Sequence, residues 1–232
     1  MSDIISKRAN SIKPSATLAL TIKATELKAK GEDVIALNVG EPDFDTPDNI
    51  KQAAIKAIND GQTKYTTVDG TMALRKAIST KFSRENQLSY EPSQILVSDG
   101  AKHSIFNALM AIVDEGDEVV IPAPYWVSYP DMVKLVEGAP VIVSANVNND
   151  FKMTPEELEA AITPKTKLLM LNSPSNPSGK AYSKAQLQEL GQVLLKYPDV
   201  IILTDDIYEH LLWSDEPFAN IVMACPELYE RT

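Results

Sequence analysis

From residue 95 onward, apolar positions alternate between short continuous runs and helical spacing. Short runs rich in Val, Ile and Leu predict strands at 95–97, 118–121, 140–143, 167–171 and 200–203. The intervening segments predict helices at 101–113, about 126–137, 154–162 and 183–195, the third of them capped by Thr154. Strand–helix alternation with apolar strands predicts an α/β fold, in which a mostly parallel sheet carries helices on both faces.

The first third of the chain has a different pattern. It predicts a helix at 16–30, a short strand at 34–37, a loop at 38–47, and helices at about 47–59 and 71–86. Thr46 is expected to cap the helix that Pro47 opens. Residues 1–47 are therefore expected to form a separate N-terminal piece, and residues 48–232 the domain that holds the sheet.

Charge and cysteine content narrow the possible partners. The net charge of -10 disfavours nucleic acid and anionic membrane, because both bind a basic surface. No apolar run approaches the roughly 20 residues of a membrane helix. Cys225 is the single cysteine, so an intrachain disulfide is impossible and a reducing cytoplasm is the simplest compartment. Two distant histidines and the lack of a Cys-x-x-Cys pair give no metal-binding pattern.

A carboxylate and a phenol follow the last predicted strand. Asp205 and Tyr208 stand in T-D-D-I-Y-E-H, so they lie at the carboxyl edge of the sheet, where open α/β folds bind ligands. Because side chains alternate along a strand, Asp206 should face away from Asp205. Taken alone, this stretch is more often a strand end followed by a helix cap.

Three further strings lie at predicted loops or strand ends. In V-S-D-G-A-K the chain turns through Gly100 into a helix, whose first N–H groups suit a phosphate. The string A-P-Y-W-V-S-Y-P places Trp126 after a strand, and L-N-S-P-S-N-P-S-G-K places Asn176 in a rigid loop. Alone, the first string is better explained as a plain strand-to-helix turn, and Trp126 as a core or interface residue.

The joint order of these strings is more specific than any one of them. G-E-P-D-F, K-Y-T, D-G-A-K, P-Y-W, N-P-S-G and D-x-x-Y together resemble the class I aspartate aminotransferase family of pyridoxal phosphate enzymes. The resemblance covers essentially all of residues 1–232 and looks closest to the bacterial branch with aspartate and prephenate aminotransferases. It implies the large domain of PLP-transferase fold type I, preceded at 1–47 by an arm and part of the small domain.

The resemblance implies a site for pyridoxal 5'-phosphate, and it assigns four residues to the cofactor's ring. Asp205 is expected to keep the pyridine nitrogen protonated, and Tyr208 to donate a hydrogen bond to the phenolic oxygen. Trp126 is expected to stack on the ring, and Asn176 to contact the phenolic oxygen and the substrate carboxylate. Trp126 thereby also borders the substrate.

Further positions follow from the resemblance for the phosphate and the substrate. Gly100, Ala101 and Lys102 match the turn that holds the phosphate, and Lys102 also matches a lysine that reaches a substrate's distal carboxylate. Gly40 matches a contact to the substrate carboxylate. Tyr65 matches a tyrosine that reaches the phosphate of the neighbouring subunit, which implies a homodimer with a shared active site.

The family's Schiff-base lysine lies in a Ser-x-x-Lys segment beyond the Asp-x-x-Tyr, and no such segment precedes Thr232. We therefore expect a C-terminally incomplete transaminase that is inactive by itself. Its full-length form is expected to act on dicarboxylic amino acids and 2-oxo acids, aspartate and 2-oxoglutarate first and prephenate as a further possibility. Two alternatives stay open: another enzyme of this fold, such as a carbon–sulfur lyase or a cyclase, and a noncatalytic dimerising fragment.

Overall fold

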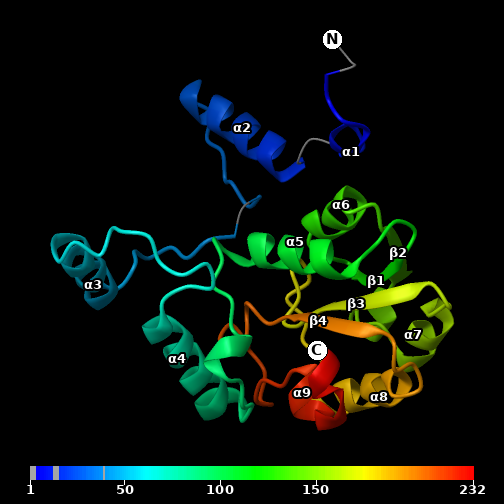
Figure 1. Ribbon diagram of the computed structural model, residues 1–232. Helices are drawn as coiled ribbons and strands as arrows, with labels where there is room; N and C mark the ends of the chain where they lie inside the picture. The colour runs from blue at the N-terminus through cyan, green and yellow to red at the C-terminus, as the bar shows by residue number, and fades with distance from the viewer. Residues whose placement is uncertain (1–3, 13–15, 39) are drawn as a thin grey trace. The chain divides into compact units, whose positions relative to one another are not determined.

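The computed structural model describes residues 4–12, 16–38 and 40–232 (Figure 1). Predictions that fall on residues 1–3, 13–15 and 39, all within the expected N-terminal piece, lie outside the described residues. The chain divides into two compact units, one of residues 1–12 with 69–232 and the other of residues 13–68. The assignment of residues 1–47 and 48–232 to two domains stays a prediction.

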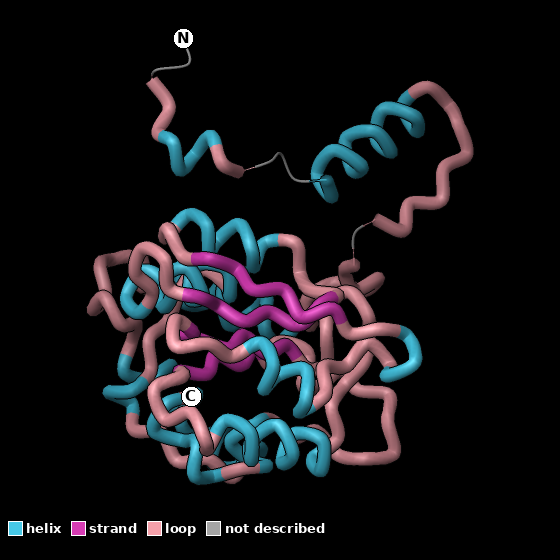
Figure 2. The backbone as a smooth tube through the Cα atoms, turned by 90° about the vertical axis from the view of Figure 1, so that its right-hand side faces the viewer, coloured by secondary structure: helices cyan, strands magenta, loops and turns pink. Residues whose placement is uncertain are grey.

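Four parallel strands form the sheet of the larger unit: β1 (Glu118–Ala123), β2 (Ala139–Ser144), β3 (Thr166–Asn172) and β4 (Ile201–Asp205). Their order is β2-β1-β3-β4, and Figure 2 shows them side by side. In chain order, β2 is added on one side of β1, and β3 and then β4 are added on the other side. Parallel pairing with helical crossovers confirms the predicted α/β fold.

Helices cover both faces of this sheet (Figure 1). Val119, Ile121 and Met170 pack with α5 (Ala101–Ile112) and α6 (Ser128–Leu135) in one apolar core. The alternate positions Val120 and Leu169 join a second core, whose helices are α7 (Pro155–Ala161), α8 (Lys184–Leu194) and α9 (Ile221–Ala224). Both faces are buried, which is why the strands read as continuous apolar runs.

Shorter elements complete the larger unit. They are α1 (Lys7–Asn10), α4 (Met72–Lys81), the π-helical turn η1 (Phe82–Asn86), and the 3₁₀ turns η2 (Pro92–Gln94), η3 (Val147–Asn149) and η4 (Pro226–Arg231). The smaller unit contains α2 (Ala16–Ala29) and α3 (Asp48–Asn59). Among the described residues, no helix is both long and apolar enough to cross a membrane.

The predicted helix cap is present at the start of α7 and absent at the start of α3. The Thr154 hydroxyl accepts the N–H of Glu157 at 3.2 Å, and the Glu157 carboxylate accepts the N–H of Thr154 at 2.8 Å, which confirms the predicted cap of α7. At α3, Pro47 itself occupies the cap position and no side chain caps the helix, so the prediction for Thr46 was wrong. The fixed φ of proline suits either position at a helix start.

Two predicted strands are absent. Residues 34–37 and 95–97 are not part of any sheet, although both are apolar. Within the described part of residues 13–68 there is no strand to pair with 34–37, and Ile35 and Leu37 are 83% and 90% exposed. Apolar composition favours a strand, but a strand also needs a neighbour for its N–H and C=O groups.

The segment 95–97 lies beside a groove instead of a strand. Ile95 and Leu96 line a groove of about 820 Å³ together with Ile201 and Leu203 of β4. β4 is the last strand in the order, so its outer edge has no strand partner within the described residues. The segment 95–97 and β4 thus border the same groove and form no ladder with each other, even though Ile95 has extended backbone angles.

Gly191 of α8 offers a test of how tightly this helix packs. A Cβ atom at Gly191 would stand 2.8 Å from Cβ and 3.0 Å from Sγ of Cys225. Gly191→Ala is expected to lower the free energy of unfolding by about 1–3 kcal/mol, because overpacking outweighs the gain in helix propensity. Urea unfolding measures this change. Gln192→Ala, exposed on the same helix, is the control, and a more stable Gly191→Ala variant would contradict the packing described.

Candidate functional site

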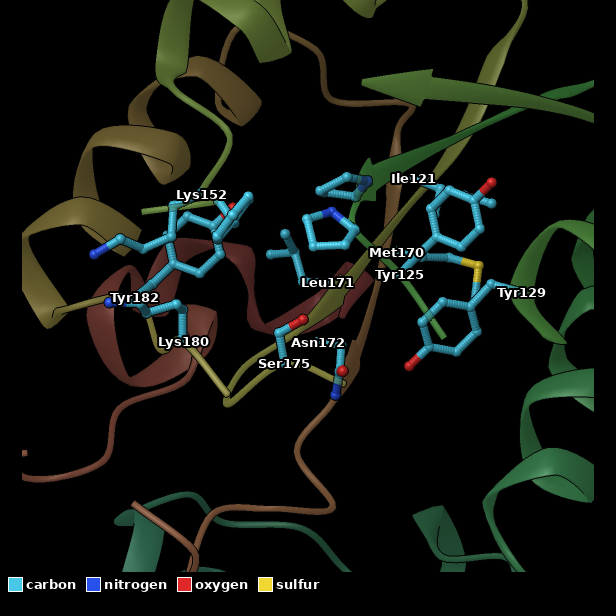
Figure 3. Close-up of a pocket in the computed structure, with 13 residues that line it drawn as sticks. Ile121, Tyr125, Tyr129, Lys152, Met170, Leu171, Asn172, Ser175, Lys180 and Tyr182 are labelled. Carbon is cyan, nitrogen blue, oxygen red and sulfur yellow. The ribbon is translucent and has the colours of Figure 1, made fainter. Parts of the chain in front are cut away.

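The strand order places a crevice at the carboxyl ends of β1 and β3. The side on which successive strands are added changes between these two strands, and open α/β sheets bind ligands at such a switch point. A cavity of about 20 Å³, enough for one water molecule, lies there against Ile121 and Asn172. Figure 3 shows Leu171, Asn172 and Ser175 between two groups of lining side chains, Tyr125 and Tyr129 on one side and Lys152, Lys180 and Tyr182 on the other.

Asp205 ends β4 at this edge, and several groups hold it in place. The Tyr129 hydroxyl donates to Oδ2 of Asp205 at 2.6 Å, and the N–H of Ile207 donates to Oδ1 at 3.3 Å. The side-chain amide of Asn172 donates to the backbone carbonyl of Asp205 at 2.8 Å. Asn172 is also the residue opposite Asp205 in the β3–β4 ladder. Carboxylate and backbone are therefore fixed from α6 and from β3.

Tyr129 lies in α6 and is 3% exposed. Burial, the neighbouring Asp205 charge and the hydrogen bond to it raise the pKa of Tyr129 far above the ordinary tyrosine value. The phenol therefore stays protonated and acts only as a donor to the carboxylate. A short O–H···O⁻ bond of this kind is stronger than one between neutral groups.

An aromatic and a cation extend this arrangement away from Asp205. The Trp126 ring meets the Tyr129 ring edge to face, with centroids 5.4 Å apart. The Lys102 ammonium lies 4.9 Å from the centroid of the Trp126 ring, within the range of a cation–π interaction. A continuous series of contacts thus joins Lys102 of α5, Trp126 of the loop before α6, Tyr129 of α6 and Asp205 of β4.

The loop after β3 is attached to the same group of contacts. Oδ1 of Asn172 accepts the N–H of Asn176 at 2.7 Å, while the amide end of the same side chain holds Asp205. Asn176 is half-buried. Asn172 therefore sets the position of the Asn176 loop relative to the end of β4.

The start of α5 offers donors to an anion. Gly100 precedes the helix with φ of 87°, a left-handed angle that a side chain would disfavour. The N–H groups of Ala101 and Lys102 have no hydrogen-bond partner in the part of the chain that the structure describes. Unpaired N–H groups at a positive helix end suit a phosphate or carboxylate.

Asp206 points elsewhere, as the alternation of side chains predicts. Its carboxylate accepts hydrogen bonds from the Thr204 hydroxyl at 2.6 Å and from the Asn220 amide at 2.9 Å. Burial raises the pKa of Asp206 above the ordinary value of 3.8, against these two hydrogen bonds, which lower it. Asp205 and Asp206 thus share no side-chain partner.

The remaining predicted site residues, Tyr208, Gly40 and Tyr65, are not part of the contacts described above. Tyr208 is half-buried and close enough for its charge to affect the titration of Tyr129. Gly40 and Tyr65 are exposed residues of the unit 13–68, so they are described within that unit alone. Their roles stay predictions.

Sequence reasoning missed two residues, Tyr129 and Asn172. Both stand inside strings that drew attention to a neighbour, Tyr129 three residues after Trp126 and Asn172 four residues before Asn176. Tyr129 follows Trp126 at the spacing of one helical turn, and this could have suggested that the two rings meet. No local signal points from Asn172 to Asp205, because the contact depends on strand register.

One group of potential metal ligands occurs among the described residues. The ligand atoms of Glu85, Glu209 and His210 lie within 4.8 Å of one another, and His210 is exposed. Lys81 is paired with Glu209 and Arg84 with Glu85, so cations of the protein already balance the two carboxylates. We therefore assign no metal to this group.

The sequence and the fold define the class of protein. The sequence pattern of the aminotransferase class I and II family matches residues 32–231, so the chain belongs to this family. The aspartate/prephenate aminotransferase of Nitrosomonas europaea is 57% identical over 228 residues, which cover 98% of this chain and 57% of that protein.

Two solved structures show the same fold. The aspartate aminotransferase from Rhizobium meliloti is 50% identical with a TM-score of 0.94, covering 98% of this chain and 57% of its own. The aspartate aminotransferase from Thermus thermophilus with maleate is 45% identical with a TM-score of 0.91, covering 96% and 58%. This agreement confirms the predicted fold type I. The chain spans a little over half the length of these relatives.

Asp206 gives the structure a measurable pH dependence. The folded state binds its proton more tightly than the unfolded chain, so this group's contribution to stability falls as the pH rises from 3.8 through the raised pKa. Asp206→Asn removes that titration. Over this pH window the stability of the variant relative to the parent is expected to increase, as measured by urea unfolding.

The matched control for this experiment is Asp215→Asn, a change at an exposed aspartate for which the same pH series should run parallel to the parent. A constant stability difference between Asp206→Asn and the parent across the window would contradict the raised pKa.

Proposed function

We propose that this chain supplies the cofactor-ring contacts of a pyridoxal 5'-phosphate-dependent aminotransferase. The observation that carries the proposal is the fixed carboxylate of Asp205 at the carboxyl edge of the sheet, linked to Trp126 through Tyr129. Family membership supports the class of reaction, since aminotransferases of this family act with this cofactor. The bound cofactor supplies an electron-withdrawing ring that stabilises negative charge at the α-carbon of an amino acid.

The residues present fit this cofactor chemically. Among the described residues, each oxygen of Asp205 accepts one hydrogen bond, so each keeps a lone pair for a further donor such as a pyridinium N–H. The N–H groups of Ala101 and Lys102, which have no partner among the residues that the structure describes, suit the phosphate. An acidic protein can therefore hold an anionic ligand, because the N–H groups at a helix end contact the ligand directly, whereas the net charge is spread over the whole protein.

The site residues have distinct tasks in this proposal. The negative charge of Asp205 favours the protonated ring nitrogen, and Trp126 fixes the ring plane by stacking. Tyr208 donates to the phenolic oxygen, and Asn176 orients that oxygen and the substrate carboxylate. Gly100 lets the chain turn into α5, where the phosphate is held.

The proposed substrates are a dicarboxylic amino acid and its 2-oxo acid partner. The relatives described above are named for aspartate, and one of them also for prephenate. The exposed Lys102 ammonium offers a cation for a distal carboxylate next to the stacking tryptophan. These names and this cation favour transamination over a carbon–sulfur lyase reaction.

Two parts of the proposal concern groups beyond the site itself. Gly40 is proposed to contact the substrate carboxylate, and Tyr65 the phosphate of a second subunit in a homodimer.

No lysine follows Lys196 in the sequence, so the 232 residues contain no candidate for the Schiff-base lysine after Asp205. We therefore propose that this chain binds the cofactor noncovalently and does not turn over without additional sequence.

Binding of pyridoxal 5'-phosphate tests the assignment of Asp205. Trp213 is fully exposed, so a Trp213→Phe background leaves Trp126 as the single tryptophan and its fluorescence as the signal. Asp205→Asn is expected to weaken binding by about tenfold or more, the usual effect of losing a hydrogen bond to a charged group. Asp215→Asn, at an exposed position, is the control. Equal affinities of Asp205→Asn and the parent would refute the assignment.

Lys102 is tested in a protein extended to the length of the relatives. Lys102→Ala is expected to raise the KM for aspartate by about tenfold or more, and to change the KM for alanine little, because only aspartate has a distal carboxylate. Lys76→Ala, at another exposed lysine, is the control. Equal effects on the two amino acids would mean that Lys102 does not recognise the distal carboxylate.

A further inference from the structure

The hydroxyl of Tyr129 makes the shortest contact to the Asp205 carboxylate among the described residues. It donates to Oδ2 at 2.6 Å, whereas the second donor, the N–H of Ile207, lies 3.3 Å from Oδ1. Bonds of the first length are typical of a hydroxyl and a charged carboxylate, and the second is near the limit of a hydrogen bond. Tyr129 is therefore the main group that fixes the rotation of this carboxylate.

Tyr129 is itself held rigidly. Its side chain is 3% exposed, its ring packs edge to face with Trp126, and α6 joins the core formed with β1 and β3. The hydroxyl is thus delivered from a packed helix to the end of a different strand, 76 residues later in the sequence. A phenol whose pKa is raised by burial and by the Asp205 charge stays a donor at neutral pH.

We propose that Tyr129 is a positioning residue that aims the Asp205 carboxylate at the ring nitrogen of the cofactor. The proposal rests on the proposed function and adds a residue to it. Tyr129 touches the carboxylate and the stacking tryptophan but acts on the ring only through them. Because one side chain contacts both, the carboxylate and the indole keep a fixed relative geometry.

A purely structural role for Tyr129 predicts a different result. If the hydroxyl only ties α6 to β4, its loss disturbs the whole site and weakens every ligand that stacks on Trp126. If Tyr129 acts through Asp205, its loss weakens only a ligand that has a ring nitrogen to pair with the carboxylate. Two ligands that differ at this single atom separate the two roles.

The experiment compares pyridoxal 5'-phosphate with its 1-deaza analogue, in which a C–H group replaces the ring nitrogen. Affinities are measured by Trp126 fluorescence in the Trp213→Phe background. Tyr129→Phe is expected to weaken binding of pyridoxal 5'-phosphate by about tenfold and to leave the affinity for the deaza analogue unchanged. Tyr229→Phe is the control, since it also removes a tyrosine hydroxyl's hydrogen bond, to the carbonyl of Ser89, away from Asp205.

A double-mutant cycle completes the test. In the presence of Asp205→Asn, the further change Tyr129→Phe is expected to have no effect on the affinity for pyridoxal 5'-phosphate, because both changes remove the same interaction. Should Tyr129→Phe fail to fold, as judged by urea unfolding, Tyr129→His restores a ring N–H donor. It is then compared with the parent on the same two ligands. Because the donor to Asp205 is kept, Tyr129→His is expected to bind both ligands as the parent does, and a weaker affinity for either would overturn the positioning role.

Each other outcome overturns a defined part of the account. Equal losses for the two ligands, or additive effects in the cycle, would overturn the positioning role and leave the proposed function intact. A normal affinity of Tyr129→Phe for pyridoxal 5'-phosphate would do the same. Failure of the unaltered chain to bind either ligand, or normal binding by Asp205→Asn, would contradict the proposed function and with it the role of Tyr129.

Discussion

All the candidate chemistry of this chain depends on the common direction of its four strands. Parallel strands end at one edge, so residues far apart in sequence meet there without any dedicated scaffold. The ends of β1, β3 and β4 are followed by Trp126, Asn176 and Tyr208 in turn. Burial of both sheet faces fixes these ends, because β1, β3 and β4 each pack against both apolar cores. The hydrogen bond from Tyr129 to Asp205 then converts proximity into a defined geometry.

Local electrostatics explain how an acidic protein can present a site for an anion. The net charge of -10 acts over a surface that water and salt screen. The helix end at Ala101 and the Lys102 ammonium act at contact distance, where screening is weak. Asp205 differs from these groups in being negatively charged. Its charge is needed in the proposed site, because a negative charge beside a pyridine nitrogen favours the protonated form of that nitrogen. The two kinds of charge serve opposite ends of one proposed ligand.

Much of the fold of the larger unit could be predicted from sequence, since Val120 and Leu169 belong to apolar runs whose burial needs helices on both faces. The predicted strands at 34–37 and 95–97 were wrong for a physical reason. Apolar composition is a local property, whereas strand pairing depends on a neighbour elsewhere in the chain. Lys102, Trp126 and Asp205 could be proposed as site residues from sequence, because the strings that carry the family resemblance stand at strand or helix ends. The contacts of Tyr129 and Asn172 with Asp205 could not be predicted, because they depend on strand register and on packing between elements far apart in the sequence.

The central claim is that the Asp205 carboxylate and the start of α5 hold the two ends of one pyridoxal 5'-phosphate molecule. A crystal structure of this chain grown with pyridoxal 5'-phosphate tests it most directly. The account predicts the ring nitrogen within hydrogen-bonding distance of Asp205, the ring stacked on Trp126, and the phosphate on the N–H groups of Ala101 and Lys102. A molecule bound with its ring nitrogen away from Asp205, or with its phosphate elsewhere, would contradict the account.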